Sequence, residues 1–219
     1  MTATAPFDER EGFAAFMLRM RAAGIGGKPL FSAMEAQPRS SFLPVEWQAA
    51  AWSPRMVPIG CGEAVEGADL QARVIDALAL EPGHRVLEIG TGSGYTAAVM
   101  ARLAARVLTL ERFRTLADEA RQRFAALGLA NVLVEREDGL SGAAAAGPFD
   151  RIVVWAAFAE MPRSFADQLS SGGVMVAPIG PGDAPQALAR LVKTGSRFER
   201  EDIGAVRLQP LAQGLPEAL

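Results

Sequence analysis

The chain has 219 residues, of which 50% are hydrophobic and 21% are charged, a composition typical of a folded globular protein and not of a disordered one. Its formal net charge of −3 at pH 7 gives no general positive field, so nucleic acid and anionic membranes are not expected as partners. A single histidine and a single cysteine exclude an internal disulfide and leave no set of metal ligands.

The N-terminal part of the sequence predicts helices and loops. Apolar residues recur at three- and four-residue spacing from Asp8 to Ala23, which indicates an amphipathic helix that ends before a glycine-rich turn. A second short helix is predicted over Leu30 to Ala36. Several prolines then interrupt the chain, so residues 37–67 are expected to form short helices and loops.

No run of residues approaches the roughly 18 apolar residues of a membrane span. The opening MTATAPFDEREGF carries charges of both signs and no continuous apolar stretch. We therefore expect a cytoplasmic protein without a signal peptide.

The rest of the chain alternates between apolar strands and helices. Asp69 is expected to cap a helix that runs through Leu80. Helices are predicted over 93–103 and 114–127, and buried strands at 86–89, 107–110, 132–134, 152–155 and 174–177. Residues 187–192 and 206–208 are candidates for two added edge strands, which can pair antiparallel.

This alternation predicts right-handed crossovers and therefore an α/β fold with a doubly wound, mostly parallel, Rossmann-like sheet. Length gives no reason to divide the chain, so we expect one domain over 1–219. Within it, residues 1–68 form a helical cap and residues 69–219 form the α/β core.

A glycine-rich segment, VLEIGTGSGY at 86–95, leads from a predicted buried strand into a helix. Glycines are needed where the backbone turns sharply and contacts a ligand. Tyr95 stands where a dinucleotide-binding fingerprint has Gly or Ala, which disfavours a dehydrogenase. Because Glu88 precedes the loop and no lysine lies in it, a cationic or zwitterionic ligand fits better than a phosphate.

Two further acidic residues follow in order along the chain. Glu111 ends the second predicted strand, where a carboxylate can accept hydrogen bonds from both hydroxyls of a ribose. Asp138 follows the third strand and can accept a hydrogen bond from an adenine amino group. Together with the glycine loop, these residues predict a site for S-adenosylmethionine.

Motifs along nearly the whole chain resemble the protein-L-isoaspartate O-methyltransferase family, which methylates the free carboxylate of isoaspartyl residues in damaged proteins. They include Pro38-Arg39, FLP at 42–44, PIG at 58–60, the glycine loop, FDRIVV at 149–154, Met161-Pro162, PIG at 178–180, Val206-Arg207 and Pro210-Leu211. The resemblance implies an S-adenosylmethionine-dependent methyltransferase with an isoaspartyl protein or peptide as its partner. We expect a monomer or weak homodimer. The implied cofactor contacts are Glu88, Gly90, Thr91, Gly92, Gly94, Glu111, Arg112, Asp138 and Gly139.

The acceptor segment departs from this pattern. After Gly62 the family continues with glutamine, threonine, isoleucine, serine, a variable residue and proline, a loop that binds the isoaspartyl group. This chain reads EAVEGA at 63–68, so it lacks the hydroxyl groups of the family's threonine and serine. The resemblance places Glu66 at the position of the family's serine, as the candidate catalytic residue, and places at the substrate Glu63, Ala64 and Val65.

The change to Glu66 bears directly on activity. An isoaspartyl carboxylate is already ionised at neutral pH and needs no general base, so the site has to orient it. An ionised Glu66 about 4 Å from the acceptor carboxylate would repel it by roughly 1 to 4 kcal/mol. This repulsion would lower the rate of methyl transfer by about one to three powers of ten. Exposure to solvent, or pairing with Arg55 or Arg73, would avoid this repulsion.

Our hypothesis from the sequence is therefore that isoaspartyl activity is weak or absent. Two alternatives stay open: a methyltransferase with a different acceptor, either cationic or neutral, and a non-catalytic S-adenosylmethionine-binding module. Trp155, at the end of the fourth predicted strand, is expected either to narrow the acceptor pocket or to pack in the core.

Overall fold

A computed structural model of the protein describes residues 8–161 and 163–216. Residues 1–7, which contributed to the prediction that no signal peptide is present, and Pro162 of the Met161-Pro162 motif lie outside these ranges. No helix in the described ranges is long and apolar enough to cross a membrane.

Two helices open the cap, α1 over Glu9–Ala22 and α2 over Lys28–Glu35. Asp8 caps α1 because its side chain accepts hydrogen bonds from the amides of Arg10 and Glu11. Both predicted N-terminal helices are confirmed to within two residues.

The proline-rich stretch contains the short 3-10 helices η1 (Arg39–Phe42), η2 (Val45–Ala50) and η3 (Gly60–Gly62), as expected. It also contains a small hairpin, in which β1 (Val57–Pro58) pairs antiparallel with β2 (Ala64–Val65). The hairpin was not predicted, because two-residue strands are too short to show an alternating pattern.

The core has α3 over Ala68–Ala77, α4 over Tyr95–Ala101 and α5 over Arg114–Ala126. Three 3-10 helices follow: η4 (Gly139–Ser141), η5 (Ala144–Ala146) and η6 (Arg163–Gln168). Its strands are β3 (Arg85–Ile89), β4 (Arg106–Glu111), β5 (Val132–Arg136), β6 (Phe149–Val154), β7 (Leu169–Ile179), β8 (Gln186–Thr194) and β9 (Arg197–Val206).

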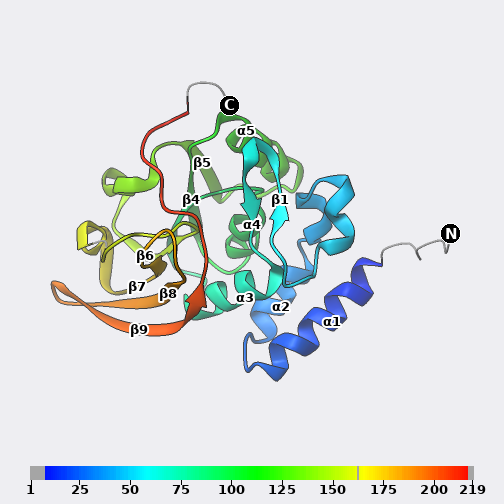
Figure 1. The fold of residues 1–219 in the computed structure, drawn as a ribbon, viewed down its shortest axis with the longest axis horizontal. Coiled ribbons are helices and arrows are strands. Elements are labelled where there is room, and N and C mark those ends of the chain that lie inside the picture. The colour runs from blue at the N-terminus through cyan, green and yellow to red at the C-terminus, as the bar shows by residue number, and fades with distance from the viewer. Residues whose placement is uncertain (1–7, 162, 217–219) are drawn as a thin grey trace.

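These seven strands form one sheet in the order β5-β4-β3-β6-β7-β8-β9 (Figure 1). The first five run parallel, and β8 and β9 add antiparallel pairs. The prediction of a doubly wound, mostly parallel sheet is confirmed.

Apolar side chains cover both faces of the sheet, because successive strand residues point to opposite sides. One face packs against the cap and the helices, through a cluster that includes Phe16, Trp52, Tyr95 and Val99. Figure 1 shows α1, α2 and α3 together on this side. The other face, which carries Ile89 among others, is covered by η6 and loops instead of α-helices.

Two predictions at the element level were wrong in detail. Asp69 does not cap α3, since Gly67 holds the N-cap position and Asp69 pairs with Arg19 at 2.8 Å. Of the two expected edge strands, β8 lies inside the sheet and β9 is the edge. Strand β9 extends over 197–206, and only Val206 of the predicted 206–208 belongs to it.

Candidate active site

A cavity that is open to solvent lies at the carboxyl ends of β3 and β4. Strand β3 lies between β4 and β6. The chain continues from β3 toward one edge of the sheet, through β4 and β5, and then crosses to the other side of β3 with β6. Ligands of open α/β sheets bind at such switch points. Four segments supply most of the wall: the glycine loop, the acceptor segment 63–66, the end of β4 and residues 209–212.

The glycine loop forms part of the cavity wall and is packed closely against its neighbours. Gly92 has a positive φ of 52°, and a β-carbon there would lie 3.3 Å from Val65 Cγ1 of the β1–β2 hairpin. Gly94 begins α4, and a β-carbon there would lie 3.0 Å from the Phe124 ring. Gly90, Thr91 and Gly92 line the cavity, whereas Gly94 does not.

The side chain of Glu88 is fully buried beneath the loop. Its carboxylate accepts hydrogen bonds from Thr96 Oγ1 at 2.5 Å, Thr109 Oγ1 at 2.7 Å and Trp155 Nε1 at 2.9 Å. Burial raises the pKa of Glu88 to about 7. Glu88 therefore links β3, β4 and α4 through its hydrogen bonds, and its carboxylate does not reach the cavity wall.

Glu111 reaches the cavity from the end of β4. Its carboxylate accepts from the amides of Gly92 at 2.9 Å and Phe113 at 3.0 Å, and burial raises its pKa. An ionised carboxylate accepts about four hydrogen bonds, so capacity remains for a ligand. Arg112 lines the wall beside it.

Asp138 is turned toward its own loop and the C-terminal segment. Its carboxylate accepts from Leu140 N at 2.9 Å and Gly214 N at 2.6 Å. Gly139 lines the cavity, and a β-carbon there would lie 2.3 Å from Ile89 Cγ2. At this predicted adenine position, the structure brings Gly139 and not the Asp138 side chain to the wall.

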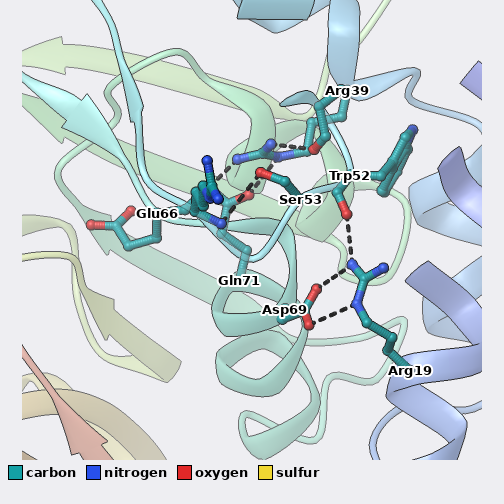
Figure 2. A network of polar contacts seen from close by, with 9 residues as sticks. Arg19, Arg39, Trp52, Ser53, Glu66, Asp69 and Gln71 are labelled. Carbon is teal, nitrogen blue, oxygen red and sulfur yellow. Dashed lines mark hydrogen bonds and ion pairs between the residues drawn. The ribbon is translucent and has the colours of Figure 1, made fainter. Parts of the chain in front are cut away.

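The acceptor segment is held by a buried arginine (Figure 2). Arg39 donates from Nη2 to the Glu66 carbonyl at 2.6 Å, from Nε to Gln71 Oε1 at 2.9 Å, and from Nη1 to the Ala51 carbonyl. Residues Glu63 to Glu66 of this segment all line the cavity. The β1–β2 hairpin thus places the acceptor segment directly against the glycine loop.

The Glu66 side chain is only 7% exposed, and in Figure 2 its carboxylate points away from the Arg39 guanidinium. No side chain among residues 8–161 and 163–216 donates a hydrogen bond to it, and neither Arg55 nor Arg73 pairs with it. Burial raises its pKa to about 7. Neither of the two expected ways for Glu66 to avoid the acceptor is therefore realised.

Several contributors to the wall were not assigned to the site from sequence, among them the C-terminal segment and a glutamine of α3. The C-terminal segment 209–212 lies along the cavity: Pro210 bridges to Ala157, and Gln209 donates to the Glu63 carboxylate. Pro210-Leu211 stood out only as a family motif, because a loop without regular pattern gives no signal of where it folds back. Gln71 also lines the cavity, from α3.

Trp155 is buried in the core, which confirms one of its two expected roles, and it also lines the cavity; that it narrows the acceptor pocket stays a prediction. Within the described ranges, no group of three or more His, Cys, Asp or Glu side chains could hold a metal ion.

A family model described as protein-L-isoaspartate(D-aspartate) O-methyltransferase matches residues 13–215. The chain belongs to this methyltransferase family. A protein-L-isoaspartate O-methyltransferase of Rhodopseudomonas palustris (strain BisB18) is 46% identical over 204 residues, which cover 93% of this chain and 94% of that one. A protein of the same name from Rhizobium meliloti (strain 1021) is 45% identical over 186 residues, or 85% of this chain and 91% of that one.

Solved structures agree with this family membership. A protein-L-isoaspartate O-methyltransferase aligns with a TM-score of 0.79 at 25% identity, covering 94% of this chain and 66% of that one. A Plasmodium falciparum protein described as a putative member, in complex with S-adenosyl-L-homocysteine, aligns with a TM-score of 0.77 at 21% identity and supports the fold. It covers 91% of this chain and 98% of that one.

Proposed function

We propose that the chain transfers the methyl group of S-adenosylmethionine to the free carboxylate of isoaspartyl residues in proteins and peptides. The family match over residues 13–215 supports this function. The observation that carries it in the structure is the contact of the β1–β2 hairpin with Gly92, which joins the acceptor segment and the glycine loop in one cavity. We further expect the protein to act in the cytoplasm, without nucleic acid as a partner.

The residues at the cavity fit the cofactor. Glu111 retains acceptor capacity for a ribose, and Gly139 presents backbone without a side chain beside Ile89. Gly90, Thr91 and Gly92 would follow the amino-acid part of the molecule with their backbone. When bound, S-adenosylmethionine supplies a sulfonium methyl that is already electrophilic.

The protein therefore has to bind, orient and exclude water, and needs no base to activate the acceptor. The Arg39 hydrogen bonds fix the backbone of the acceptor segment, which sets where an acceptor carboxylate lies relative to the glycine loop. The C-terminal segment 209–212 closes the cavity from a further side.

The deciding experiment offers the full chain an isoaspartyl peptide and its aspartyl twin, with methyl-labelled S-adenosylmethionine. We expect label in the isoaspartyl peptide only. Binding of S-adenosylhomocysteine by calorimetry, with no transfer to either peptide, would overturn the proposal in favour of a binding module or a different acceptor. The aspartyl peptide is the matched control, because it has the same composition and charge.

A further inference from the structure

The Glu66 carboxyl group has no function in the fold that its contacts reveal. It is 7% exposed and lines the cavity, and no described side chain donates to it. The Arg39 donors beside it are engaged by the carbonyls of Ala51 and Glu66 and by Gln71. Among the described residues, the backbone amide of Glu66 itself is the donor that stabilises this carboxyl group. A buried carboxyl with so little hydrogen bonding has capacity for a ligand that completes it.

The charges around Glu66 disfavour its ionised form. Arg39, on η1, is the one cation that influences it among the neighbours that shift its pKa, and Glu88 on β3 and Glu63 on the same segment oppose it. The same cavity wall carries Glu111, Arg112 and Glu137. Bringing a further carboxylate, that of an isoaspartyl residue, against Glu66 would place two anions in the part of the cavity where Glu66 is only 7% exposed to solvent.

Two carboxyl groups in such a space are stable when they share a single proton, since the neutral acid then donates a hydrogen bond to the anion. A protonated carboxyl provides one O–H donor, as a serine hydroxyl does. The family resemblance implies a serine hydroxyl at this position, where this chain carries Glu66.

We propose that Glu66 receives the acceptor carboxylate as a neutral carboxylic acid, which donates its O–H in a hydrogen bond, so that acceptor binding takes up a proton whenever Glu66 begins ionised. This inference rests on the proposed function. A methyl ester product carries no charge, so after transfer Glu66 is free to ionise again and the shared-proton hydrogen bond no longer holds the product.

The raised pKa of Glu66, about 7 in the free protein, sets the pH range in which this coupling is visible. Below it the donor is already in place, and acceptor binding is independent of pH. Above it each binding event needs one proton, so the KM for the acceptor rises about tenfold per pH unit. An isoaspartyl carboxylate does not titrate in this range.

The test measures kcat and KM for an isoaspartyl peptide without other groups that titrate between pH 6 and 9, at saturating S-adenosylmethionine. The wild-type KM is expected to rise about tenfold per unit above pH 7. Glu66→Gln, which donates from an amide at every pH, and Glu66→Ser are expected to give a flat KM. Glu199→Gln, on the exposed part of β9, is the matched control and should keep the wild-type slope.

Calorimetry adds a readout that does not depend on turnover. At pH 8, peptide binding in two buffers of different ionisation enthalpy should report uptake of about one proton by the wild type and none by Glu66→Gln. The affinity for S-adenosylhomocysteine should be equal in both, which verifies that the variant is folded.

A wild-type KM that stays flat to pH 9, or an unchanged slope in both variants, would overturn the role of Glu66 while leaving the proposed function intact. Preference for a peptide that carries an amine in place of the carboxylate would also overturn it. Absence of transfer from the wild type at every pH is the separate result that removes the proposed function itself.

Discussion

The phenol of Tyr95 lies in the core between aromatic rings, 5.3 Å from the Phe42 centroid and 6.3 Å from that of Trp52. Its hydroxyl is buried and finds no hydrogen-bond partner among the described residues. An unsatisfied buried hydroxyl opposes folding, so Tyr95→Phe is expected to leave stability unchanged or raise it by about 1 kcal/mol. Chemical denaturation measures this, and Tyr95→Ala, which opens a cavity, should lose roughly 3 to 5 kcal/mol. A loss on Tyr95→Phe would reveal a partner for the hydroxyl.

A second prediction for a single residue tests whether Glu111 contributes to cofactor binding. Its carboxylate both organises the amides of Gly92 and Phe113 and faces the cavity. Removing charge-assisted hydrogen bonds of this kind costs about 1.5 to 3 kcal/mol, so Glu111→Ala should weaken S-adenosylhomocysteine binding roughly 10- to 100-fold in calorimetry. The exposed Glu46→Ala is the control, and equal affinity in both variants would contradict the assignment.

At the scale of elements, Arg39 links η1 to the acceptor segment. Arg39→Met would leave the carbonyls of Ala51 and Glu66 without their donors, at a cost in stability of about 2 to 4 kcal/mol. Because the Glu66 backbone would lose its anchor, the KM for the acceptor should rise more than the dissociation constant for S-adenosylhomocysteine. Steady-state kinetics and calorimetry separate the two. An equal loss in both would mean that Arg39 acts only through general stability.

The C-terminal segment provides a second element-scale prediction through Asp138. If its carboxylate anchors the segment at Gly214, as the 2.6 Å hydrogen bond indicates, Asp138→Ala should speed amide hydrogen exchange over residues 209–216. Cofactor affinity should fall only several-fold, because the wall formed by the segment loosens. A large loss of affinity without faster exchange would instead support a direct contact of Asp138 with adenine.

For the whole molecule, Glu66 and Glu88 predict an unusual dependence of stability on pH. Each has a folded pKa of about 7 against 4.5 for a solvated glutamate. The folded state therefore binds protons more tightly than the unfolded state, and the free energy of unfolding falls as pH rises from about 4.5 through 7. A full shift of this size corresponds to roughly 3 kcal/mol per group.

The ligand-free protein is accordingly expected to be more stable at pH 5.5 than at pH 8.5. Urea denaturation at both pH values measures this difference. Glu66→Gln should reduce the difference in stability between the two pH values by the contribution of Glu66, and Glu199→Gln should leave that difference unchanged. If wild type and Glu66→Gln have the same pH dependence, the Glu66 carboxyl is ionised without cost in the folded state.

Most of the sheet was predictable because β3, β4 and β6 each contain a short, mainly apolar run. Strand β9 was not, because an exposed edge strand reading RFEREDIGAV lacks that pattern. In the candidate site, Glu66 was singled out from a resemblance, but its burial depends on packing that no local pattern records. The orientation of Glu88 could have been found, since alternation along β3 turns it to the same face as Val86.

The position of the C-terminal segment has a consequence for the order of events in synthesis. Residues 209–212 form part of the cavity wall, yet they follow every strand of the sheet in the chain. A ribosome therefore completes the sheet before it supplies this wall. Nascent chains halted after β9 would fold around an incomplete cavity, and cofactor capture would be among the last steps of their maturation.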